Sequence, residues 1–191
     1  MKASVQVLAA MAGVAFASAA ASATIFVYTA AMDGITEAPP NASPGIGFTT
    51  VTIDDVLNTM RVEATFSGLL GTTTAAHIHA ATAVPMSGTA GVATQTPSFL
   101  GFPLGVTAGS MDTTFDMTLA SSYNASYITA NGGTPLSAFA ALKSAMDTGR
   151  AYFNIHSSVF GGGEIRGFLV PAPGVASLIG LAGVLAARRR R

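Results

Sequence analysis

The three histidines of the chain are the residues best suited to chemistry, and they fall in two short segments. His77 and His79 lie in Ala-His-Ile-His-Ala, and His156 ends Tyr-Phe-Asn-Ile-His. In a strand, His77 and His79 point to the same face. If the two segments are neighbouring strands, the three imidazoles converge, and three nitrogen ligands plus water make a zinc or copper site. Such a site needs ring nitrogens within about 6 Å of one another, because metal–nitrogen bonds are ~2.0–2.1 Å long.

Two charged residues after the third histidine bear on how this cluster is interpreted. Glu164 is the carboxylate expected near His156, where it would orient an imidazole through its second ring nitrogen. Glu164 and Arg166 also fall on one face of a strand, so they could form an ion pair that fixes the local geometry. The sequence leaves two interpretations open, a metal site and a purely structural set of histidines. A dinuclear dismutase site is excluded, because three histidines and no cysteine cannot build one.

Other catalytic patterns are missing from the sequence. Ser67 and Ser110 lack the strand–turn–helix context of an activated nucleophile. The glycines at 161–163 precede a strand and not a phosphate-binding helix. Asp54 and Asp55 do not have the spacing of a calcium-binding loop. We therefore expect a protein that is not an enzyme, with no certain cofactor and with zinc or copper as the candidate metals.

The composition indicates one domain that does not bind nucleic acid. The chain has 191 residues and a formal net charge of zero, but Arg188–Arg191 hold four of its nine basic residues. Between Thr24 and Leu169, four basic residues stand against nine acidic ones, which leaves a net charge of about −5. Nucleic-acid binding requires a basic face, so this class of partner is excluded. Because the chain has no cysteine, its stability must come from a hydrophobic core.

Residues 24–169 mostly have the two-residue periodicity of β-strands. The clearest strand is 59–66, in which four apolar residues point one way: Met60, Val62, Ala64 and Phe66. Further strands are expected at 25–29, 48–53, 75–80, 113–119, 151–156 and 164–169, the last two as a hairpin. The prolines of 38–45 exclude regular pairing there, and 84–107 is typical of an irregular connection. The pattern predicts an all-β fold, an antiparallel Greek-key sandwich or barrel.

One short helix is expected late in this domain. Thr134 can cap its start, Pro135 suits its first position, and Gly149 ends it. Its apolar stripe consists of Leu136, Phe139, Leu142 and Met146.

The first 23 residues have the features of a signal peptide. Lys2 is basic, Val5–Ala20 is apolar, and Ala21-Ser22-Ala23 fits a small-residue cleavage site, which places the mature start at Thr24. An uncleaved membrane anchor is the alternative.

The last 22 residues, 170–191, form a second targeting segment. A proline motif consists of Val170, Pro171, Ala172, Pro173 and Gly174. An apolar stretch follows, predicted as a hydrophobic transmembrane helix over 175–187, and a basic cluster consists of Arg188, Arg189, Arg190 and Arg191. This arrangement resembles the bacterial PEP-CTERM sorting signal, which implies an exosortase as processing enzyme and a transient anchor in the inner membrane. Ala172 departs from the glutamate of that motif. A permanent single-pass anchor is the alternative.

The body of the chain resembles the CHRD domain, the module named after chordin and found in bacterial secreted proteins. The resemblance rests on the Pro-Pro loop at 37–43, on Phe66–Leu69 before the first two histidines, and on 149–156 leading into 163–167. It covers about residues 28–169. Residues 80–83 depart from the family, which has a Gly-Pro-Ala-like run there. The resemblance implies an all-β fold and an extracellular setting, and no single activity.

Together these features predict an exported bacterial protein of the cell surface or extracellular matrix. Its first expected role is non-enzymatic binding or adhesion, with exopolysaccharide or surface proteins as partners. The alternative is an extracytoplasmic zinc- or copper-binding domain that uses His77, His79 and His156.

Overall fold

The computed structural model describes residues 24–173. The expected signal peptide, and the hydrophobic helix and arginine cluster of the tail, lie outside the described residues. Among the helices at 24–173, none has the length and apolar character needed to cross a membrane.

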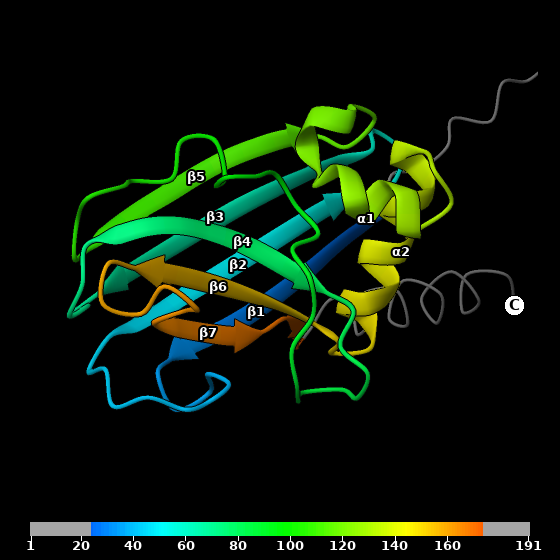
Figure 1. Cartoon of the computed structure of the whole chain (residues 1–191). Helices are drawn as coiled ribbons and strands as arrows, with labels where there is room; N and C mark the ends of the chain where they lie inside the picture. Colours follow the sequence, from blue (N-terminus) through cyan, green and yellow to red (C-terminus); the bar gives the residue numbers. More distant parts are fainter. Residues whose placement is uncertain (1–23, 174–191) are drawn as a thin grey trace, which may run out of the picture.

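The domain is built on one eight-stranded sheet in which every named pair is antiparallel. The strand order is β4-β6-β7-β1-β2-β3-β5, and β8 also pairs with β1. The sheet curls into a half-barrel (Figure 1). The strands are β1 (Ile25–Asp33), β2 (Ile46–Asp54), β3 (Thr59–Ser67), β4 (Thr73–Ala80), β5 (Gly109–Asp116), β6 (Ala151–Ser157), β7 (Ile165–Phe168) and β8 (Val170–Pro171).

The curl of the sheet creates the core, and it modifies the expected sandwich. The antiparallel β architecture is confirmed, but a single sheet folds over itself and stays open between β4 and β5. β7 joins β1 through the pair Asp33 and Arg166. Phe99 links the two sides, since its ring lies 5.8 Å from that of Phe153 on β6 and 5.2 Å from that of Phe115 on β5. The β4-β6-β7 side therefore packs over the β3-β5 side through buried aromatic rings.

The alternation predicted for β3 is confirmed, whereas the bounds of the strand expected at 113–119 need correction. The four apolar residues of β3 are all buried. β5 begins at Gly109 and ends at Asp116, so Leu119 lies beyond the strand and is 52% exposed. Leu119 precedes a 3-10 helix at Ala120–Ser122, which ends the two-residue alternation.

The late helix is confirmed, and a second one precedes it. α2 (Pro135–Asp147) starts with a capping box between Thr134 and Ser137. Leu136 is exposed, in contrast to the other three residues of the expected stripe. The sequence analysis missed α1 (Ala125–Ala130), which is capped by the Asn124 side chain.

The sheet extends into the expected sorting motif. β8 pairs with β1 at Tyr28 and Thr29, and the amide of Ala172 donates to the carbonyl of Val27. The first residues of the motif thus pair with β1 on the same side as β7.

Candidate metal centre

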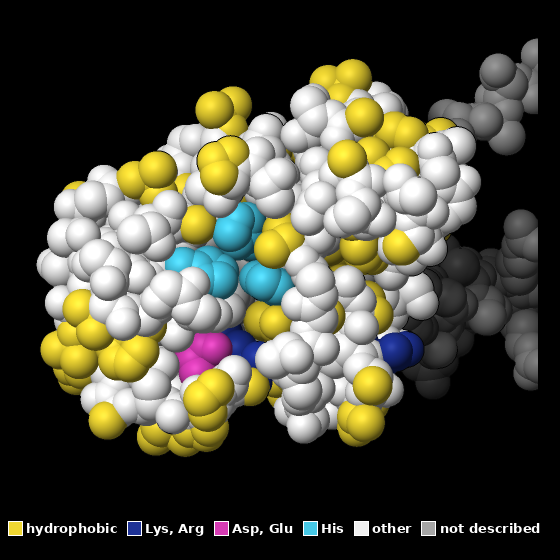
Figure 2. All heavy atoms as spheres, viewed as in Figure 1, with side chains coloured by type: hydrophobic (Ala, Val, Ile, Leu, Met, Phe, Trp, Pro, Cys, Tyr) yellow, Lys and Arg dark blue, Asp and Glu magenta, His cyan; other side chains and the backbone are white. Residues whose placement is uncertain are grey.

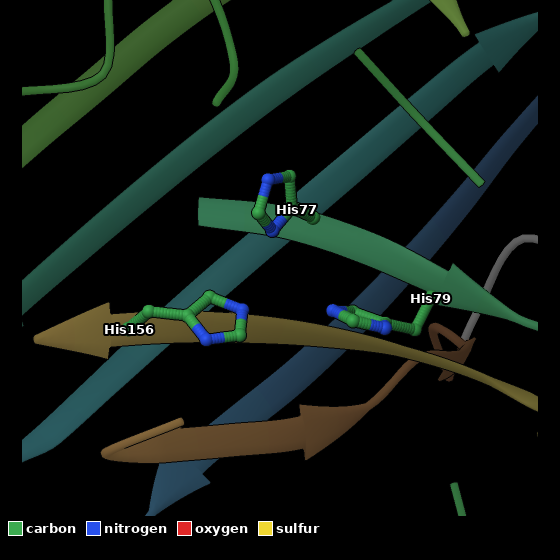
Figure 3. A group of neighbouring side chains, drawn as sticks. All are labelled: His77, His79 and His156. Atoms are coloured by element: carbon green, nitrogen blue, oxygen red, sulfur yellow. The ribbon is translucent and has the colours of Figure 1, made fainter. Parts of the chain in front are cut away.

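The two histidine segments are neighbouring strands, as the metal-site hypothesis requires. β4 and β6 pair with Ala75 opposite His156 and with His77 opposite Asn154. Residues of β6 alternate, so Phe153 and Ile155 are in the core while His156 is on the other face. The same alternation keeps Ile78 in the core. The three histidines therefore meet on the outer face of the β4–β6 pair (Figure 3).

The three imidazoles are close enough to share one metal ion. The ring centroids of His77 and His156 are 5.1 Å apart. The ring centroid of His79 lies 5.7 Å from that of His77 and 5.8 Å from that of His156. One ligand nitrogen from each ring lies within 4.8 Å of the other two. In Figure 3, ring nitrogens of His79 and His156 face each other across the space beside His77. The spacing lies within the expected limit of about 6 Å, and it exceeds slightly the roughly 4.2 Å that two bonds of ~2.0–2.1 Å can span, so a bound ion would draw the rings together by a small amount.

Backbone carbonyls fix the orientation of all three rings. His77 Nε2 lies 2.7 Å from the carbonyl of Pro97, and His79 Nδ1 lies 2.9 Å from that of Ala90. His156 Nδ1 lies 3.0 Å from the carbonyl oxygen at 161. A carbonyl can only accept, so each of these nitrogens donates a proton and the other nitrogen of the ring keeps a lone pair. The nitrogens left free are His77 Nδ1, His79 Nε2 and His156 Nε2.

These three free nitrogens are buried and have no hydrogen-bond partner. Burial lowers the pKa of all three histidines, and it lowers the pKa of His79 to about 4. The neutral form therefore dominates near pH 7, and each ring offers a lone pair and not a second N–H. A buried polar atom without a partner costs roughly 1–3 kcal/mol. Two other buried side-chain atoms of the described residues also have no partner, Glu37 Oε1 and Asn154 Oδ1, but only the histidine nitrogens belong to one group of possible metal ligands.

The segment at 90–99 supplies two of the three carbonyls. It runs along the free edge of β4, where the amide of Ala93 donates to the carbonyl of Ile78 and the amide of Phe99 donates to that of Ala76. The Thr94 hydroxyl accepts from the amide of Ile78. The connection predicted as irregular is therefore held against β4, and it fixes the orientation of two histidines.

Tyr152 supports His79 in two ways. The two rings stack with centroids 4.8 Å apart and an interplanar angle of 6°. The Tyr152 hydroxyl also lies 3.3 Å from both the amide nitrogen and the carbonyl oxygen of Ala90, the residue that binds His79 Nδ1. The ring of His79 is thus held from its face and from its edge.

Glu164 does not orient a histidine, and it does not pair with Arg166. Its carboxylate is fully buried and accepts from the Ser43 hydroxyl and from the amides of Leu70 and Gly71. Burial raises its pKa, but these hydrogen bonds and one from Ser157 outweigh that effect and lower the pKa. Glu164 therefore links its own segment to the loop that contains Ser43 and to the loop at 70–71.

Arg166 pairs instead with Glu37, a residue whose role the sequence analysis missed. Arg166 Nε lies 3.7 Å from a carboxylate oxygen of Glu37, and the guanidinium donates to the carbonyls of Thr36 and Gly88. Its Cζ atom lies 4.8 Å from the centroid of the Tyr152 ring, which also stacks on His79. Burial raises the pKa of Glu37 to about 7, although Arg166 acts in the opposite direction. Arg166 and a Glu37 carboxyl that is partly protonated near pH 7 therefore flank the histidines.

The histidine cluster reaches the surface. His77 and His79 are 7% and 8% exposed, and His156 is half-buried. Figure 2 shows the imidazoles together on one face, among mainly uncharged atoms and with acidic and basic side chains next to them. The rings therefore border the solvent, whereas their free nitrogens are buried.

Comparison with known protein families supports the domain assignment. Residues 28–169 match the family described as CHRD domain. Neither the curated proteins nor the solved structures contain a significant match to the chain. A CHRD domain is typical of extracellular or secreted proteins, and the match includes both histidine strands and Glu164. Because the match spans most of its residues, the chain belongs to the CHRD family.

Proposed function

We propose that this CHRD domain binds one transition-metal ion, zinc or copper, through His77, His79 and His156. The proposal rests on one observation: each of the three neighbouring rings has one buried nitrogen without a partner, and one ligand nitrogen from each ring lies within 4.8 Å of the other two. Nitrogens bound to one zinc ion stand roughly 3.3 Å apart, given tetrahedral bonds of ~2.0–2.1 Å. Small rotations of the side chains bring the rings to that spacing.

The donor set selects the class of metal. Neutral imidazole is a good ligand for zinc and copper and a poor one for calcium or magnesium, which prefer oxygen. The carbonyl bonded to each second nitrogen is the outer support that ligating histidines usually have. A purely structural histidine would gain from a partner on both nitrogens, so the three free nitrogens favour the metal site.

Metal analysis tests this function directly. The chain has no histidine outside the cluster. A polyhistidine tag would add a second metal-binding site, so the protein must be purified without one. After loading with zinc or copper and dialysis, the wild type is expected to retain about one equivalent of metal. The His77→Ala/His79→Ala variant is expected to retain less than roughly a tenth, because a single imidazole holds metal weakly.

A matched control comes from the strand β2. Thr50 and Thr52 have the same two-residue spacing on the outer face of β2, and Thr50→Ala/Thr52→Ala should retain metal as the wild type does. A wild type without metal, or a histidine variant with its full complement, contradicts the proposed function.

We also propose that the protein is exported and sorted through its tail, as the resemblance to the PEP-CTERM signal implies. The CHRD domain supports an extracellular setting. The expected association with surface polymers or surface proteins stays a prediction from the sequence.

Mass spectrometry of the intact protein tests the processing step. The mature protein is expected to begin near Thr24 and to lack the residues after about Pro173. A mature protein that keeps its full tail contradicts sorting by cleavage and favours the permanent anchor.

A further inference from the structure

We propose that the metal ion keeps one coordination position open for a small anion from solution, with hydroxide as its resting occupant. This inference rests on the proposed function and specifies what the site does with its metal. It follows from the donors that the chain has, from their charge, and from the access to the cluster.

The chain offers no fourth ligand of the usual kinds. It has no cysteine and no other histidine, and its nine acidic residues all lie within the described part of the chain. Only Glu37 and Glu164 among these are buried. Glu164 is bound by the loops at 43 and 70–71. Glu37 contacts Arg166 and keeps one unpartnered oxygen, but it is not part of the group of close ligand atoms that the three histidines form. Three protein ligands plus an exchangeable one is the arrangement of reactive zinc sites, whereas structural sites have four protein ligands.

The charges around the cluster favour an anion in that position. Three neutral imidazoles leave the charge of the metal uncompensated, and a buried charge without compensation is costly. Arg166 adds a positive charge behind the Tyr152 ring, which stacks on His79, and Glu37, whose pKa burial raises to about 7, offsets this charge only in part. A negative ligand is therefore bound more tightly than a neutral one of the same size.

The geometry limits the size of that ligand. The three ring centroids are only 5.1–5.8 Å apart, and the partly exposed His156 marks the side that solvent reaches. Rings this close together favour an anion of few atoms, and hydroxide is available because a bound metal lowers the pKa of its water.

Azide titration of the copper(II) protein tests this inference. Azide that enters the metal's coordination sphere is expected to produce a new saturable charge-transfer band and a changed electron paramagnetic resonance spectrum. The metal should stay with the protein, as measured in an ultrafiltrate. Metal-free protein should show neither change.

If copper is bound at one equivalent and azide leaves both spectra unchanged, or strips the metal, the open position is refuted while the proposed function stands. If no metal binds, the proposed function itself fails.

The role of Arg166 has its own matched pair of variants. Arg166→Met is expected to weaken azide binding by about three- to tenfold, because it removes a nearby positive charge. Lys143→Met removes the same charge from α2, where Lys143 pairs with Asp147, and should leave the affinity for azide unchanged. Equal azide affinity in all three proteins would show that Arg166 does not favour the anion.

Discussion

Replacing Glu164 with alanine is expected to lower the free energy of unfolding by roughly 3–5 kcal/mol, because it leaves buried donors without their acceptor. The Ser43 hydroxyl and the amides of Leu70 and Gly71 all donate to this carboxylate. The melting temperature should fall by about 10 °C or more. Urea unfolding and calorimetry measure the two quantities.

The exposed Glu63 provides the control for this change. Its side chain is 39% exposed and pairs with Arg61 at the surface, so Glu63→Ala should cost less than about 1 kcal/mol. Glu164→Gln keeps the side-chain volume and removes the charge. Comparing it with Glu164→Ala therefore separates the loss of the carboxylate's hydrogen bonds from the effect of the cavity. Because the pKa of Glu164 is lowered, its contribution is present above the ordinary pKa and is lost as the pH falls through the folded-state pKa. A Glu164→Ala variant as stable as Glu63→Ala would contradict the anchoring role.

The sequence predicts the strands of this domain because every second residue of a strand faces the core and is apolar. On β3 every second residue is apolar and reaches the core, and on β6 Phe153 and Ile155 do the same while His156 takes the other face. The capped start of α2 was predictable for a similar reason, since Thr134 and Pro135 act on their own neighbours. Local patterns of this kind need no knowledge of what packs against them.

The partners of the histidines could not be predicted, because they are main-chain carbonyls. Every residue has a carbonyl, so nothing in the sequence marks Pro97 or Ala90 as the groups that orient His77 and His79. For the same reason the sequence did not predict that 90–99 lies against the edge of β4, because main-chain hydrogen bonds hold it there. The convergence of the histidines was conditional on β4 and β6 being neighbours, and that pairing joins segments about 75 residues apart in the chain.

The charged residues show a different limit. Glu164 and Arg166 are two positions apart, which suggested a pair, but each is bound by a group more than 90 residues away. Glu37 offered only a weak signal, an acidic residue next to two prolines in the Pro-Pro loop. Spacing along a strand predicts which face a side chain takes, and long-range packing decides what it contacts there.

The stability of the metal-free protein should depend on pH through His79. The unfolded chain takes up a proton near pH 6.5, whereas burial lowers the pKa in the folded state to about 4. The unfolded state therefore binds more protons between these values, and the stabilising effect of a neutral His79 is lost as the pH falls from 6.5 to 4. The full effect is roughly 3 kcal/mol. It is measured as the difference in unfolding free energy between wild type and His79→Asn, in chelator, at a series of pH values.

Taking the difference between two proteins isolates His79 from the other titrating groups. Glu37 has a raised pKa, so its own contribution changes in the opposite direction, but it is present in both proteins and cancels. Thr74→Asn, at an exposed position on the same strand, should shift the free energy by an amount that does not vary with pH. Parallel curves for wild type and His79→Asn would mean that the ring takes up a proton as easily in the folded state as in the unfolded chain. A lone pair so open to protons would not be the buried, unpartnered donor on which the metal site depends.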